Sequence, residues 1–130
     1  MSDAHRIRLL GHTDQGGRPD GVQVMVAKGH AYVGHMFSDG IAVIDVTDPR
    51  APNPVDFVAC PPNTRASHIQ VHDGLLLAVN AANVWALQQY EKQQDYFGKS
   101  LADSFDRRDR GFAAGMRVFD LADPAAPREI

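Results

Sequence analysis

Apolar and polar residues alternate in short runs along this chain, and Gly, Asp or Pro bounds each run. Valine occupies every second position of 22–26, which predicts a strand with one apolar face. A Lys-Gly turn leads to a second predicted strand at 31–36, so the two runs form a tight hairpin. Apolar residues on both faces of 41–46 predict a third strand that is covered on both sides. A fourth strand is predicted at 55–59, after a loop with two prolines.

The same order of elements recurs further along the chain. A second hairpin is predicted at 67–71 and 75–80, and residues 115–127 then repeat the pattern of 40–52. The second copy differs by an insertion, 81–114, between its second and third strands. A four-strand unit that repeats every 40–45 residues or so, about the period here, is typical of a β-propeller blade.

We therefore predict an all-β chain that forms part of a β-propeller, with blades of four antiparallel strands. The predicted units of this partial propeller domain (1–130) are an outer strand and channel loop at 6–20, a first blade at 21–59 and a second blade at 67–130. The last outer strand is expected to begin at 128–130. Because propellers have roughly four to eight blades, we expect another polypeptide chain or a missing segment to complete the ring. That second chain would be a cleaved partner, a subunit or further copies of this chain; a truncated chain is the alternative.

Both copies of the repeat contain the pattern Gly-x-x-Val-[Ile/Phe]-Asp-[Val/Leu]-x-Asp-Pro-x-x-Pro, at 40–52 and 115–127. This pattern resembles the LVIVD-repeat family of propeller proteins, over about 21–130 without the insertion. The resemblance implies the propeller fold and says little about activity. Members of that family are usually much longer, with enough blades to close a ring.

In a propeller, the loops 11–20, 37–40, 60–66 and the insertion 81–114 would lie on one face, at the mouth of the central channel. Function in propellers usually resides there, because rigid blades hold loops that can vary. The histidines expected at this mouth are the predicted ligands of one divalent metal ion (Zn, Mn, Fe or Cu): His12, His35 and His68. The alternative is that they are hydrogen-bonded structural groups.

Other side chains expected at the mouth suit a small-molecule substrate. Arg65 and Arg18 are candidate clamps for an anionic group; the alternative is that they form loop salt bridges. The insertion is rich in helix formers over 83–94, so we expect it to be mainly helical. Its aromatic residues, among them Trp85 and Tyr90, fit a substrate-binding lid, a docking surface for another chain, or a small satellite core.

Besides a small-ligand binder without turnover, two functions follow from this pattern. The first is an enzyme with its site at the channel mouth, a metal-dependent hydrolase or lyase acting on a small molecule, with His68 and Asp14 as acid–base groups. The second is a non-catalytic propeller scaffold for protein–protein interaction. The histidines and the insertion favour the first, and the lack of a recognisable catalytic motif favours the second.

Composition narrows the choice of partners. The chain has 130 residues, a net charge of −3 and 44% hydrophobic residues. The negative charge argues against a nucleic-acid or anionic-membrane partner, because both need a basic surface. No apolar stretch approaches the length of a transmembrane helix. The single cysteine, Cys60, cannot form an internal disulfide, so we predict a cytoplasmic location.

Overall fold

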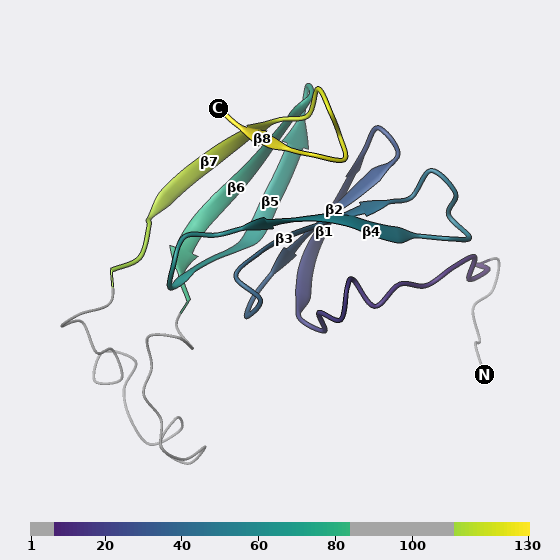
Figure 1. Ribbon diagram of the computed structural model, residues 1–130, viewed down its shortest axis with the longest axis horizontal. Coiled ribbons are helices and arrows are strands. Elements are labelled where there is room, and N and C mark those ends of the chain that lie inside the picture. The colour runs from purple at the N-terminus through teal and green to yellow at the C-terminus, as the bar shows by residue number, and fades with distance from the viewer. Residues whose placement is uncertain (1–6, 84–110) are drawn as a thin grey trace, which may run out of the picture.

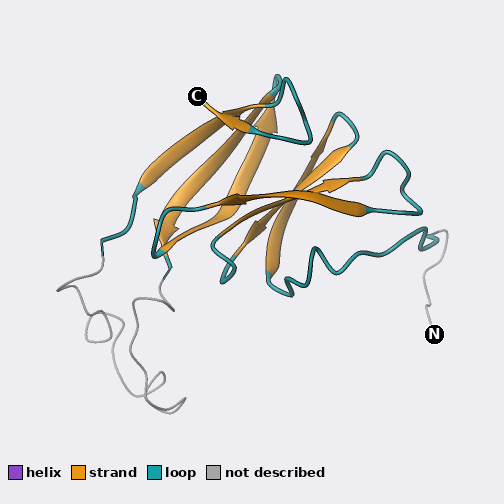
Figure 2. Cartoon of the chain, in the orientation of Figure 1, coloured by secondary structure: helices purple, strands orange, loops and turns teal. Residues whose placement is uncertain are grey.

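The computed structural model describes residues 7–83 and 111–130. These residues form two four-stranded antiparallel sheets, with strand orders β1-β2-β3-β4 and β5-β6-β7-β8 (Figure 1). The described residues contain no helix (Figure 2), so this part of the chain is all-β, as the alternating pattern predicted. Most of the predicted helical insertion, residues 84–110, lies outside the described residues.

Each sheet is formed by consecutive strands of one repeat. Sheet 1 contains β1 (Gly21–Ala27), β2 (His30–His35), β3 (Gly40–Asp45) and β4 (Asn53–Ala59). Sheet 2 contains β5 (Thr64–His72), β6 (Leu75–Ala82), β7 (Gly115–Asp120) and β8 (Arg128–Glu129). The last strand begins where the sequence predicted it.

The two sheets are built alike in detail. Both first hairpins turn through two residues with positive φ, Lys28-Gly29 and Asp73-Gly74, which suits the right-handed twist of the strands. The first strand of each sheet also has a register shift near its start, at 21–23 in β1 and at 65–68 in β5. The two sheets therefore share the form of their first hairpin and the place of their register shift.

The aspartates that recur in the repeat close equivalent turns. Asp45 Oδ1 accepts a hydrogen bond of 2.8 Å from the Thr47 amide, and Asp120 Oδ1 accepts one of 2.8 Å from the Ala122 amide. In each copy the carboxylate binds the backbone two residues later, which is the geometry of an Asx turn. Both residues therefore have a structural role in their turns.

The main hydrophobic core lies between the two sheets. Tyr32, Ile41 and Val43 of sheet 1 are fully buried against the facing side chains of sheet 2 and of the segment between β7 and β8. Those facing side chains are Ala66, Ile69, Leu76, Ala78, Phe119 and Leu121. Since the apolar residues of both sheets leave water together, this contact is the main source of stability of the described fold.

Polar contacts fix how the sheets stack. Lys28 Nζ donates to the Leu121 carbonyl at 2.9 Å, and the Ile69 amide donates to Gln23 Oε1 at 2.8 Å. Arg117 Nη1 donates to the carbonyl of Ala59 at the end of β4, at 3.1 Å. These bonds cross the stack at different strands, so the two sheets are held in one orientation.

The segment 7–20 precedes sheet 1 and contains no strand within the described residues. The outer strand predicted near its start would need a neighbouring strand of a further sheet, which the described chain does not hold. That strand therefore stays a prediction. The described residues also contain no helix with the length and apolar character that crossing a membrane requires.

Candidate functional site

Buried polar side chains gather at one end of both sheets. We call it the loop end: β1, β3, β5 and β7 begin there, and β2, β4 and β6 end there. The buried polar residues at this end are His35, Thr64, Ser67, Asn80 and Asn83. At the opposite end, only His30 is a buried polar residue among those described. The loop end is also the face that the sequence predicted as the mouth of a channel.

Asp20 organises the loop end of sheet 1. Its Oδ2 accepts hydrogen bonds of 2.6 Å from the backbone amides of Phe37 and Ser38, and its Oδ1 accepts one from the Ser38 hydroxyl. His35 Nδ1 lies 3.0 Å from Asp20 Oδ1 and must donate, because a carboxylate can only accept. Burial alone would raise the pKa of Asp20, but the bonds from Ser38, Phe37 and His35 outweigh it and hold the pKa well below its ordinary value.

A second set of polar contacts joins the two sheets at this end. Asn83 Nδ2, just after β6, donates to Asp39 Oδ1 in the β2–β3 loop. The Asp39 carbonyl accepts from the Cys60 amide at 2.8 Å, and Asp39 itself has a positive φ of 52°. The β2–β3 loop is therefore held by Asp20 from its own sheet and by Asn83 from the other.

Some buried side-chain atoms at the loop end have no hydrogen-bond partner among the described residues: Gln15 Oε1, His35 Nε2, Arg65 Nε and Asn80 Oδ1. His35 and Asn80 are equivalent in the repeat, since each is the sixth residue after its hairpin turn. Unpartnered buried polar atoms are costly and point to a functional role or to a missing partner. They make the loop end the strongest polar candidate in the described part of the chain.

The structure does not bring the three predicted metal ligands together. His35 lies on the side of sheet 1 that faces away from sheet 2, whereas His68 is exposed on the side of sheet 2 that faces away from sheet 1. Strand alternation thus sends the two rings to opposite sides of the stack. Within 7–83 and 111–130, no three His, Cys, Asp or Glu side chains are grouped to hold a metal ion.

Of the remaining predicted site residues, three from one loop lie together and the others lie elsewhere. His12 and Asp14 are exposed and line a hollow of about 380 Å³ formed by their own loop, with Arg18. The Arg18 guanidinium carbon lies 3.7 Å from the centre of the Phe57 ring. This is a cation–π contact, so Arg18 has a packing role in addition to its charge. Arg65 lies at the register shift of β5. Trp85 and Tyr90 lie outside the described residues.

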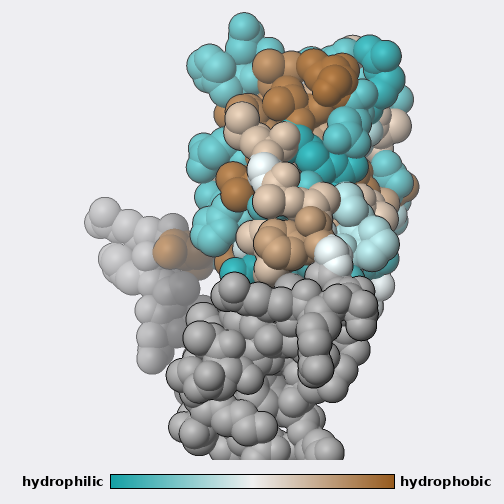
Figure 3. Space-filling model, turned by 90° about the vertical axis from the view of Figure 1, so that its left-hand side faces the viewer, coloured by the Kyte–Doolittle hydropathy of each residue, from teal (hydrophilic) through white to brown (hydrophobic). Residues whose placement is uncertain are grey.

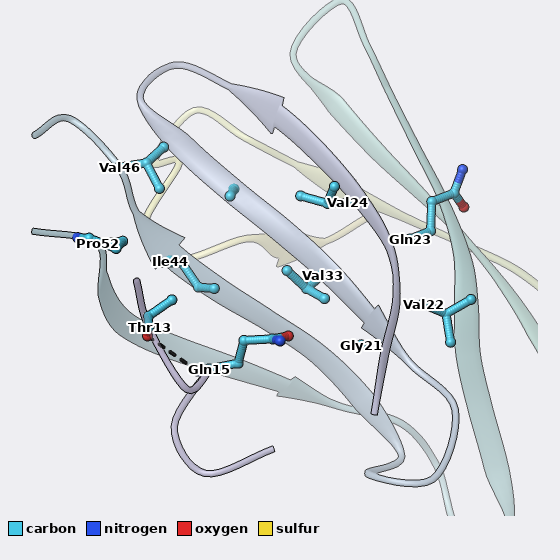
Figure 4. Close-up of a pocket in the computed structure, with 11 residues that line it drawn as sticks. Thr13, Gln15, Gly21, Val22, Gln23, Val24, Val33, Ile44, Val46 and Pro52 are labelled. Atoms are coloured by element: carbon cyan, nitrogen blue, oxygen red, sulfur yellow. Dashed lines mark hydrogen bonds between the residues drawn. The ribbon is translucent and has the colours of Figure 1, made fainter. Parts of the chain in front are cut away.

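Two apolar sheet faces lie on opposite sides of the stack, and part of each face is exposed. The open face of sheet 1 carries Val24, Val26, Ala31, Val33, Ile44 and Val46. Val24 and Val26 on β1 are 59% and 65% exposed, whereas Ala31, Val33 and Ile44 are buried. A hollow of about 370 Å³ lies on this face, with Thr13 and Gln15 of the preceding segment along one side (Figure 4).

The open face of sheet 2 is apolar as well. It carries Leu75, Leu77, Val79, Met116, Val118 and Ile130. Met116 and Ile130 are 61% and 67% exposed. Viewed from the left-hand side of Figure 1, hydrophobic residues gather towards the upper end of the molecule (Figure 3).

The repeat relates each open face to a covered one. In sheet 1 the covered face carries Tyr32 and Val43, whose equivalents in sheet 2 are Leu77 and Val118 on its open face.

In sheet 2 the covered face carries Ile69, Leu76 and Phe119. Their equivalents are on the open face of sheet 1, at Val24, Ala31 and Ile44. The sheets are thus stacked in the same sense, like successive members of a row, and not face to face by symmetry.

Sequence patterns did not indicate the residues that join the sheets. Arg117 occupies a covered position whose equivalent in sheet 1 is Ala42, and its guanidinium is bound by Glu129, with Nη2–Oε2 at 2.8 Å. The one signal was a charged residue in an otherwise apolar strand of the repeat.

Comparison of the sequence with models of known protein families gives no match, and comparison with curated proteins gives none either.

Proposed function

We propose that this chain is a pair of propeller blades of the LVIVD-repeat type and acts as a non-catalytic scaffold for protein–protein interaction. The observation that supports this proposal most directly is the relation between the faces of the two sheets. Each open face occupies the same position in the repeat as a face that is packed against the other sheet. A propeller is built by adding blades in this same sense, so each blade covers the next. Further sheets of the same kind are therefore the natural partners of both open faces.

The exposed surface supports the same proposal. Soluble proteins seldom leave a contiguous apolar sheet face in water, and such faces mark interaction sites. On these two faces, several valine and methionine side chains are at least half exposed, although the strands that carry them are otherwise well packed. Covering both faces would bury these side chains and give the chain more of the core that two sheets alone lack.

An enzyme with its site at the loop end is the second candidate. Its support is the buried His35–Asp20 pair, with His35 Nε2 unpartnered within the described residues. In such a site Asp20 would orient the imidazole, and Nε2 would face the reacting group. The dispersed positions of His12 and His68 weigh against a metal held by the three predicted histidines.

Metal analysis of protein purified without chelator, together with native mass spectrometry, separates the two candidates. The scaffold proposal predicts species heavier than the 14.2 kDa chain and no divalent metal retained in proportion to the chain. A monomer that retains one divalent ion per chain, and loses it in His35→Ala, would contradict the scaffold and favour the enzyme. A control variant, His72→Ala, removes an exposed histidine at the opposite end.

A further inference from the structure

We infer that a second copy of this chain docks head to tail on the open face of sheet 1, through its own open face of sheet 2. This inference rests on the proposed function and names the partner. The two faces differ from each other, so the contact is heterologous: one copy offers Val24 and Val26, and the other offers Met116 and Val118. Such a contact repeats from copy to copy until the rotation closes a ring.

The contact inside the chain provides the template. There, Ile41 and Val43 of sheet 1 pack with Ile69, Leu76 and Phe119 of sheet 2. In the contact between copies, Met116 and Val118 take the places of Ile41 and Val43. On sheet 1, Val24, Ala31 and Ile44 hold the places of Ile69, Leu76 and Phe119. Val24 is exposed, whereas Ala31 and Ile44 are buried and line the hollow of this face. Every residue that takes another's place in this way is apolar, so the contact between copies retains an apolar centre.

The polar contacts carry over only in part. Within a chain, Gln23 Oε1 accepts a hydrogen bond from the Ile69 amide. In the contact between copies, His68 of one copy holds the place of Gln23, and it lies opposite the Val24 amide of the other copy. Tyr32 and Lys28, which donate to carbonyls across the stack, are replaced by Leu77 and Asp73. The contact between copies thus has fewer hydrogen bonds than the contact within a copy. It gives exposed His68 a position inside the assembly.

One difference between the two contacts changes the distance between the packed sheets. A Cβ on Gly34 would lie 2.5 Å from the Ala66 carbonyl oxygen, so β2 and β5 approach closely only because Gly34 has no side chain. Its equivalent on the open face of sheet 2 is Val79, which is 50% exposed. The copies therefore lie further apart at the loop end than the two sheets within a chain do.

The occupant is a second copy because the two faces on one molecule already have the chemistry of a matched pair. A partner with a different fold would match one face and leave the other uncovered. Each contact between two copies covers one open face on each copy, and closing the ring covers every open face. Both faces also lack charged side chains at their centres, so identical copies meet no like-charge repulsion there.

The test uses two single-face variants of the full chain, Val24→Lys and Met116→Lys, in sedimentation velocity. Either lysine would place an ammonium group in the apolar contact and weaken association by more than about tenfold. Each variant keeps one intact face. We therefore expect each to be monomeric alone and an equimolar mixture to form a dimer of twice the 14.2 kDa chain mass. Ala126→Lys, in the exposed turn before β8, adds the same charge elsewhere and should associate like the wild type.

The outcomes distinguish this inference from the proposed function. Association of the wild type without a dimer in the mixture would overturn the head-to-tail contact. A monomeric wild type that binds 8-anilinonaphthalene-1-sulfonate, with less binding in both variants, would overturn the second copy as partner but keep open faces that await other sheets. A monomeric wild type that binds no dye would overturn both the inference and the proposed function.

Discussion

The Tyr32 hydroxyl of sheet 1 donates a hydrogen bond of 2.8 Å to the carbonyl of Pro124, in the turn that follows β7. Its ring is fully buried in the core between the sheets. One residue thus supplies both the apolar contact and a directional bond across the stack. The prolines of the repeat therefore do more than end strands, because here one of their carbonyls fixes the neighbouring sheet.

Tyr32→Phe should lower the free energy of unfolding by about 1 kcal/mol, because the Pro124 carbonyl loses its donor while the ring packing remains. Urea unfolding followed by circular dichroism measures the change. Lys28→Met removes another donor across the stack and should give a loss of similar size. No change in either variant would mean that these bonds do not hold the sheets.

Tyr32 also predicts a dependence on alkaline pH. Burial, with a smaller effect from Asp123, raises the pKa of Tyr32 to about 12 from 10.0. Because the folded state disfavours the phenolate, the stabilisation is complete below about pH 10 and is lost as the pH rises towards 12. Wild type should therefore lose stability between these values more steeply than Tyr32→Phe. Parallel curves for the two proteins would contradict a buried phenol.

Asp20→Asn should destabilise the loop end. The carboxylate accepts bonds from the backbone of Phe37 and Ser38, and an amide side chain cannot accept all of them. We expect a loss of about 1.5–3 kcal/mol at neutral pH, measured by urea unfolding. Asp56→Asn is the matched control, since its carboxylate is exposed and, among the described residues, accepts a hydrogen bond from the adjacent Phe57 amide alone.

The same carboxylate predicts the response to acid. Since the pKa of Asp20 is lower in the folded chain than its ordinary 3.8, its stabilisation is present above that value and is lost as the pH falls below it. The wild type should lose stability in acid, and Asp20→Asn should lose less over the same range. An equal loss in both proteins would assign the acid response to other carboxylates.

Gly34→Ala should disturb the stacking of the sheets. The added methyl group would meet the carbonyl oxygens of Ala66 and Ser67 at 2.5 and 2.8 Å, and both are backbone atoms. We expect a loss of about 1–3 kcal/mol from this overpacking. At Gly17 an added Cβ meets nothing, but φ is positive, so Gly17→Ala would report backbone strain alone. A Gly34→Ala variant with wild-type stability would contradict the close approach of β2 and β5.

Arg117→Ala should destabilise the chain by about 1–2 kcal/mol, because the guanidinium joins β7 to the Ala59 carbonyl as well as to Glu129. Arg50→Ala removes an exposed pair with Asp48 and should change stability by less than about 0.5 kcal/mol. Chemical denaturation of both variants gives the comparison. Equal effects would show that Arg117 is no more than a surface ion pair.

The order of strands was predictable because it depends on local signals. Alternating valines marked β1, the Lys28-Gly29 and Asp73-Gly74 turns set the hairpins, and the recurring aspartates closed equivalent turns. Each of these signals acts within a few residues, so one sequence suffices to interpret it. The start of β5 was less clear, because the register shift there breaks the alternation.

The candidate site was less predictable because it depends on which side of a sheet a side chain faces. His35 and His68 both lie near the loop end, and the sequence grouped them by that position. The pairing register puts them on opposite sides of the stack. The contacts of Arg117 with Ala59 and of Asn83 with Asp39 depend on how the sheets stack, which local patterns do not encode.

The most direct test of the account is an isotope-filtered NOE experiment on an equimolar mixture of ¹³C-labelled and unlabelled chains. It detects only contacts between copies. We predict cross-peaks from the methyl groups of Val24 and Val26 to those of Met116 and Val118. Cross-peaks between copies from any other surface, or none from either open face in the associated protein, would contradict the claim that the repeat continues across these two faces.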